Sequence, residues 1–117
     1  MRRKAMLLCL LLCVLLTACG KKQISDEQAI AAIKRYCYSS DPNLESMVDA
    51  GDYPIYWDLS SSDEHEIVVL FRAYTGAQIR YHIDPVSGET YTTEFVPGIS
   101  MEEERTEERF NVRDYLD

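Results

Sequence analysis

The chain has 117 residues, with 12 Lys and Arg against 20 Asp and Glu, and a formal net charge of −8 at pH 7. This surplus of acid excludes the basic face that nucleic-acid binding requires, so we expect no nucleic acid among its partners. The length allows one domain with a modest core, which leaves a homodimer as one means of further stabilisation.

The N-terminal segment combines a cationic start with an apolar run. Arg2, Arg3 and Lys4 precede an uninterrupted apolar stretch at residues 6–16. A membrane-spanning helix needs about 20 apolar residues, so this run has the length of a signal-peptide core instead. At its end, Leu16-Thr17-Ala18-Cys19 resembles the lipobox of bacterial lipoprotein precursors.

The lipobox resemblance implies removal of residues 1–18 as a signal peptide and lipidation of Cys19. Two acyl chains anchor a protein stably, so the domain would stay at the extracytoplasmic face of the cell membrane, on a tether of residues 19–24. Cleavage would leave 9 Lys and Arg against 20 Asp and Glu, a net charge of −11. The alternative is an ordinary signal peptide that ends in Ala-Cys.

Such processing would leave the chain with one free thiol. Cys9 and Cys13 leave with the signal peptide and Cys19 becomes a thioether, so Cys37 has no partner for an intramolecular disulfide. Cys37 falls on an apolar helix face, which predicts a buried thiol. An intermolecular link is the alternative.

The first predicted helix begins after Ser25. Gln28 lies three residues further on, which is the spacing of a capping box. The helix should end near Ser40, because the following Asp41 precedes a proline. A 3.6-residue period places its apolar residues on one face: Ala29, Ile30, Ile33, Tyr36 and Cys37. Residues 43–52 are less regular, and one more helical turn closed by Gly51 is an option there.

After Gly51 the apolar period changes to two, which is typical of strands. Alternation marks strands near residues 53–59, 67–74, 79–84 and 90–95, separated by a polar loop and two glycine-containing turns. Short turns between consecutive strands predict an antiparallel meander. We therefore expect an α+β domain at residues 25–98, with one N-terminal helix packed on a three- to four-stranded antiparallel meander, and Trp57 in its core or at its rim.

Residues 99–117 have a different composition. Glutamate crowds the segment, and its apolar residues lack a sustained period. This pattern predicts an acidic tail that is a solvated helix or partly disordered. Docking of Phe110 and Tyr115 onto the domain is the less favoured alternative.

The turn motif Asp84, Pro85, Val86, Ser87, Gly88, together with the helix sequence Ala29-Ile30-Ala31-Ala32, resembles a PepSY-type domain over roughly residues 25–95. In such a turn the Asp84 carboxylate can accept backbone N–H groups, Ser87 fits the motif, and Gly88 tolerates a positive φ. The resemblance implies a non-catalytic extracytoplasmic module of the kind proposed to restrain proteases or regulate envelope proteins. Cystatin-like folds are a competing resemblance.

No motif for catalysis, metal or cofactor stands out. The densest cluster of potential metal ligands is Asp63-Glu64-His65-Glu66, but adjacent residues of an extended loop point apart, so we expect no metal. A thiol enzyme built on Cys37 would need an exposed, electropositive pocket, whereas Cys37 lies on the apolar face. We therefore expect no enzyme activity, no catalytic residue and no cofactor.

One strand offers a candidate partner face. Alternation places Arg80, His82 and Asp84 on the same side of their strand, either as an ordinary exposed face or as a contact surface. We expect a membrane-tethered lipoprotein that acts as a protein-interaction or regulatory module, with an envelope or secreted protein as partner. The alternative is an accessory lipoprotein that binds a small ligand, which would need a concave apolar pocket.

Overall fold

The structure, a computed structural model, describes residues 22–116. The predicted signal peptide, the lipobox and Cys19 therefore lie outside the described residues. Within residues 22–116, no helix has the length and apolar character needed to cross a membrane.

Helix α2, Asp26–Ser40, has the start that the capping box predicts. The Ser25 hydroxyl accepts the backbone N–H of Gln28 at 3.1 Å, and the Gln28 side chain accepts the N–H of Ser25 at 3.0 Å. The helix ends before Asp41, whose N–H donates to the carbonyl of Cys37. Its predicted bounds and the burial of Cys37 are confirmed, since one face of α2 is buried at Ala29, Ala32, Ile33 and Cys37.

A second helix, α3, spans Leu44–Ala50. Leu44 is buried against the core, and Gly51 closes the helix in the left-handed conformation at φ 70°, with its N–H donating to Met47. Glycine adopts this conformation without the penalty of a Cβ atom. The prediction of a single helix is therefore wrong, and the optional turn before Gly51 is a helix of 7 residues.

The sheet is an antiparallel meander of five strands in the order β1-β2-β3-β4-β5. The strands are β1 Tyr56–Ser62, β2 Ile67–Arg72, β3 Gln78–Ile83, β4 Glu89–Phe95 and β5 Glu104–Asn111. A short 3-10 helix, η1 Val112–Tyr115, follows β5. The α+β class and the meander are confirmed, whereas three to four strands is an underestimate.

The fifth strand corrects the prediction for the C-terminal segment: residues 104–111 form β5 instead of a solvated helix or a disordered tail, and the helical part within residues 99–116 is the short 3-10 helix η1. β5 pairs with β4, Phe110 stacks on Tyr36 with ring centroids 3.6 Å apart, and Val112 is fully buried. The register shifts between Tyr91 and Thr93, so a bulge interrupts the two-residue period that would have identified the strand. The many charges are ordinary for an edge strand, where they oppose pairing with other chains.

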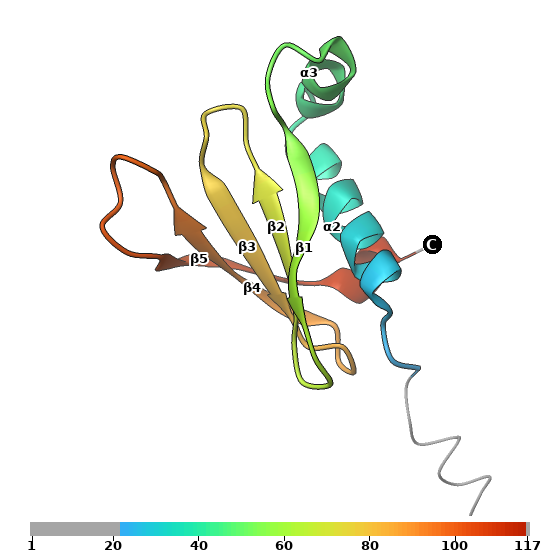
Figure 1. The fold of residues 1–117 in the computed structure, drawn as a ribbon. Helices are drawn as coiled ribbons and strands as arrows, with labels where there is room; N and C mark the ends of the chain where they lie inside the picture. Colours follow the sequence, from blue (N-terminus) through green and yellow to red (C-terminus); the bar gives the residue numbers. More distant parts are fainter. Residues whose placement is uncertain (1–21, 117) are drawn as a thin grey trace, which may run out of the picture.

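The core lies between α2 and one side of the sheet, called here the covered face (Figure 1). Ile33 of α2 is fully buried and belongs to one core cluster with side chains of the interior strands β2 and β3, which include Val69 and Ile83. The opposite side is called the open face. No helix among residues 22–116 covers the open face (Figure 1).

The two ends of the described chain meet at the β3–β4 turn. Ile24 donates its N–H to the carbonyl of Pro85 at 2.8 Å, and Arg113 donates to the carbonyls of Lys22 at 2.8 Å and Val86 at 2.6 Å. Gly88 has a φ of +82°, and a Cβ atom there would lie 2.4 Å from the Asn111 side chain. Residue 22 therefore leaves the domain at one end of the strands, beside this turn.

Candidate functional site

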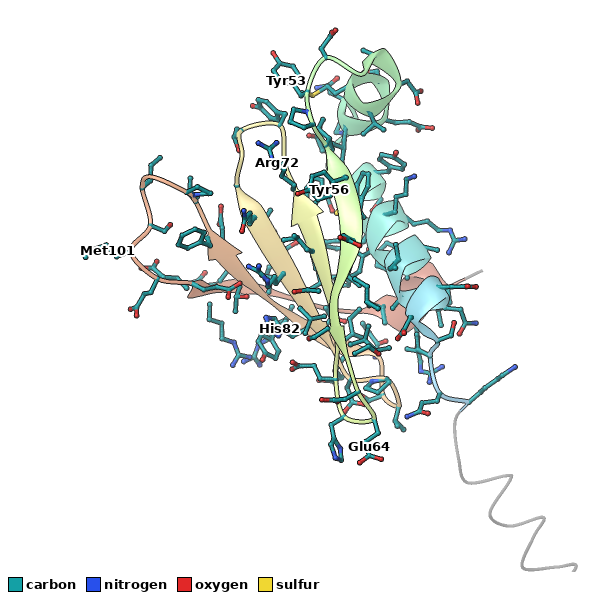
Figure 2. The ribbon with its side chains drawn as sticks, in the orientation of Figure 1. Tyr53, Tyr56, Glu64, Arg72, His82 and Met101 are labelled. Carbon is teal, nitrogen blue, oxygen red and sulfur yellow. The ribbon has the colours of Figure 1, made fainter. Side chains whose placement is uncertain are left out.

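The open face carries half of the cations of the described chain. Side chains that pair across neighbouring strands share a face, and the pairs Val68–His82, His82–Tyr91 and Tyr91–Arg109 trace this side of the sheet. In Figure 2, His82 lies on the side of the sheet away from α2. Four of the eight Lys and Arg residues within 22–116 belong to this face: Arg72, Arg80, Arg105 and Arg109.

A hydrogen-bonded network runs across this face from β3 to the segment before β5. His82 Nε2 lies 2.8 Å from the Thr93 hydroxyl, Thr93 donates to Glu103 at 2.8 Å, and Arg80 donates to the same Glu103 oxygen at 3.0 Å. A carboxylate only accepts, so the single Thr93 hydrogen goes to Glu103. His82 Nε2 must therefore carry a hydrogen and donate it to Thr93. We call Arg80, His82, Thr93 and Glu103 the open-face network.

The network also settles the charge of Glu103. Partial burial alone would raise the pKa of Glu103, but hydrogen bonds from Thr93 and Arg80 outweigh it and lower the pKa below its ordinary value of 4.5. A charge-assisted hydrogen bond to a carboxylate favours the ionised form. Glu103 is therefore ionised at neutral pH and holds the side chains of Arg80 and Thr93 in place.

An aromatic stack adjoins the network. The His82 ring lies parallel to the Tyr91 ring, with centroids 4.5 Å apart, and the Arg105 guanidinium lies 4.2 Å from the Tyr91 centroid. His82 Nδ1 faces a Glu66 carboxylate oxygen at 3.4 Å. These contacts restrict the rotamers of His82 and Tyr91. They also lie beside Val68, the apolar partner of His82 in the register, which is only 4% exposed.

The structure brings together two of the three residues of the predicted partner face. Arg80 and His82 share the open-face network, but β3 ends at Ile83, and Asp84 belongs to the turn. The Asp84 carboxylate accepts the backbone N–H groups of Val86 at 2.8 Å and of Ser87 at 3.1 Å. These bonds, led by the one from Ser87, lower the pKa of Asp84. Its role is therefore to hold the turn.

The sequence did not single out the residues that complete the site. Thr93 and Tyr91 lie on β4 opposite Arg80 and His82, and Glu103 comes from the loop before β5. Strand alternation alone places Tyr91 and Thr93 on one face of β4. Their contact with β3 depends on the register, and Glu103 depends on a fifth strand that the sequence analysis did not predict.

An apolar groove lies near the C-terminal end of α2. It has a volume of about 150 Å³ and is lined by residues that include Cys37, Leu44, Phe71 and Tyr81. The Cys37 sulfur lies 3.4 Å from the Tyr81 hydroxyl, and burial raises the pKa values of both groups. The half-buried Trp57 approaches the thiol, but its indole N–H makes no hydrogen bond of ordinary geometry among the described residues. The thiol is therefore protonated and a poor nucleophile at neutral pH.

The acidic β1–β2 loop behaves as a structural turn. The Asp63 carboxylate accepts the backbone N–H groups of His65 and Glu66, each at 2.8 Å, and these bonds lower its pKa. His65 and Glu64 are both exposed and lie 3.3 Å apart. In the part of the chain that the structure describes, no group of three or more His, Cys, Asp or Glu side chains is arranged to hold a metal ion.

The chain was compared with known proteins at three levels. No protein-family model, no curated protein sequence and no solved structure matched it.

Proposed function

We propose that this chain is a membrane-tethered extracytoplasmic lipoprotein whose domain is a non-catalytic protein-interaction or regulatory module. The proposed location is supported by the N-terminal cations, the apolar run and the lipobox-like Leu16-Thr17-Ala18-Cys19. Lipidated Cys19 would anchor the chain, and an envelope or secreted protein would be the partner. The turn motif of Asp84, Ser87 and Gly88 supports the likeness to a PepSY-type domain.

The observation that carries the proposal is the organisation of the open face. Arg80 and His82 are held by Thr93 and Glu103, and no helix of the described chain covers them. Side chains already held in place lose little rotamer freedom when a partner binds, so a face of this kind favours association.

The position of the tether supports a recognition role for the open face. Residue 22 leaves the domain beside the β3–β4 turn, at the ends of the strands. Ile24 is buried in the core and Lys22 is hydrogen-bonded to Arg113, so the predicted tether of residues 19–24 shortens to residues 19–21, which can span at most about 10 Å when fully extended. The membrane would then lie near the strand ends, and the open face would be turned sideways toward neighbouring proteins.

The small-ligand alternative has weaker support. Pockets for small molecules usually enclose about 300–1,000 Å³ and are mostly apolar, whereas the apolar groove beside Cys37 has about 150 Å³. A larger hollow between β4 and β5, of about 340 Å³, is lined mostly by polar and charged residues. The ionisable groups of the groove are a protonated thiol and the Tyr81 hydroxyl, which are joined to each other. A groove of this size and chemistry supports packing of the core better than capture of a ligand.

Site-specific photo-crosslinking on intact membranes tests the proposal. A photoreactive phenylalanine analogue replaces Tyr91 on the open face or, as the matched control, Lys34 on the exposed side of α2. The account predicts a discrete crosslinked protein partner from position 91 and none from position 34. Equal labelling from both positions, or none from position 91, would contradict a recognition role for the open face.

A further inference from the structure

A hollow of about 340 Å³ lies between β4 and β5, beside the aromatic stack. Its lining includes Tyr91, Arg105 and Arg109. The hollow follows from the register of the two strands. Tyr91 pairs with Arg109 and Thr93 pairs with Arg105, so β5 advances by four residues over the length in which β4 advances by two. The extra residues make a bulge, and bulges commonly redirect side chains at sheet edges.

The two arginines in this lining lack acidic partners. Among residues 22–116, neither Arg105 nor Arg109 makes an ion pair or a side-chain hydrogen bond, although the same strand carries Glu104, Glu107 and Glu108. Arg80, by comparison, is paired with Glu103. The two guanidinium groups therefore line one hollow without an ion pair among the described residues.

Arg105 is also held in position. Its guanidinium lies 4.2 Å from the centroid of the Tyr91 ring, and the His82 ring is stacked parallel on Tyr91. A cation–π contact of this kind occupies none of the guanidinium N–H groups with an acceptor oxygen, so they stay available as donors. Tyr91 therefore orients Arg105 without using its hydrogen-bonding capacity.

We infer that the hollow between Arg105 and Arg109 is a carboxylate-binding subsite of the open face, which takes an aspartate or glutamate side chain from an acidic peptide segment of the partner protein. This inference rests on the proposed function, since it names the chemistry of the partner. The planar fork of an arginine matches the two oxygens of a carboxylate, and two such forks are available here. The Glu89 carboxylate also lines the hollow, so the two guanidinium groups attract the incoming carboxylate against one negative charge.

An NMR titration of the full chain in detergent tests the inference. The probes are a capped Ala-Glu-Ala-Glu-Ala peptide and its glutamine counterpart, observed through the side-chain Nε–Hε signals of Arg105 and Arg109. We expect both signals to shift with the glutamate peptide and to stay in place with the glutamine peptide. Because hydrogen bonds between charged groups are strong, Arg109→Gln should weaken binding about tenfold.

Control variants separate the subsite from general charge effects. Lys34→Gln removes one positive charge from α2 and should leave the affinity for the glutamate peptide unchanged. Arg109 is exposed, so Arg109→Gln should keep the fold, which unchanged backbone amide signals from α2 would verify. An equal loss of affinity in Lys34→Gln would overturn the inference, as would equal binding of the two peptides.

The NMR titration and the crosslinking test can fail independently of each other. If photo-crosslinking from position 91 captures a partner but the glutamate peptide shifts neither arginine signal, the open face recognises proteins and the carboxylate subsite is refuted. If the peptide binds through both arginines but no partner is captured, the proposed function fails while the hollow retains its affinity for carboxylates.

Discussion

The two faces of the sheet are made from alternate residues of the same strands, yet they differ in what holds them together. On β3, Tyr81 and Ile83 face α2 and are buried, whereas Arg80 and His82 face outward and are held by hydrogen bonds. Burial of apolar surface is the larger source of stability, since a surface ion pair contributes about 0–1 kcal/mol. The comparison indicates that the covered face maintains the fold and leaves the open face available for recognition.

The largest effect should come from the covered face. Ile33→Ala removes a fully buried side chain from the centre of the core and should lower the free energy of unfolding by about 2–5 kcal/mol. Urea denaturation followed by tryptophan fluorescence measures this change, because Trp57 packs against the same core. Glu27→Ala, at an exposed position of the same helix, is the control and should change stability by less than about 1 kcal/mol. Similar losses in both variants would contradict the assignment of the core.

A large effect is also expected at the turn that joins both ends of the domain. Gly88→Ala places a Cβ atom 2.4 Å from Asn111 at a φ of +82°, so both strain and a clash result. We expect a loss of about 1–3 kcal/mol from the backbone conformation, with further loss from displacement of Asn111. Gly98→Ala is the matched control, because it has the same φ of +82° with no atom within 4 Å of the added Cβ. Thermal unfolding should show Gly88→Ala as the less stable variant, and the opposite order would be inconsistent with the close approach.

A smaller effect should follow substitution in the open-face network. His82→Gln interrupts the contacts with Thr93 and Glu66 at a half-buried position. The free energy of unfolding should fall by about 1 kcal/mol or less, because surface polar interactions contribute little. A loss as large as that of Ile33→Ala, measured under the same denaturation conditions, would mean that the open face also maintains the fold.

The smallest expected effects are opposite pH dependences of two glutamates near β5. The pKa of Glu103 is lowered, so its stabilising contribution is present above its ordinary pKa of 4.5 and is lost as the pH falls through the folded-state value. Burial raises the pKa of Glu108, whose carboxylate accepts the Tyr36 hydroxyl, so its contribution is present below pH 4.5 and is lost as the pH rises through the folded-state value.

Carboxyl NMR titrations check this pair directly. Glu103 should titrate below 4.5 and Glu108 above it. Glu103→Gln should remove part of the stability loss on acidification, and Glu108→Gln should remove part of the loss on neutralisation. Titration of both carboxyl groups at the same pH would show that the two sides of β5 do not differ in environment.

The elements with strong local signals could be predicted from the sequence. The capping box of Ser25 and Gln28 located the start of α2, and two-residue periods with glycine turns identified the meander. β5 lacked such a signal, because its bulge breaks the alternation and its glutamates suggest a solvated segment. The tertiary pairing with β4 and the stacking of Phe110 on Tyr36 determine its structure instead.

The candidate site could be predicted only in part for a related reason. Strand alternation placed Arg80 and His82 on one face. The prediction extended the strand past its end at Ile83 and so included Asp84, whose carboxylate holds the β3–β4 turn. The partners Thr93 and Glu103 are set by the register of β3 on β4 and by the return of the chain into β5. Local sequence patterns carry no information about such long-range neighbours.

The separation of roles between the two faces can be tested most directly with Arg80→Glu. This charge reversal faces Glu103 across a contact of 3.0 Å and should disrupt the open-face network without reaching the core. The account predicts a free energy of unfolding within about 1 kcal/mol of the parent, together with loss of the partner crosslinked from position 91. Lys34→Glu, with the same change of charge on α2, should retain that partner. Undiminished crosslinking of the same partner in Arg80→Glu would contradict the assignment of recognition to the open face.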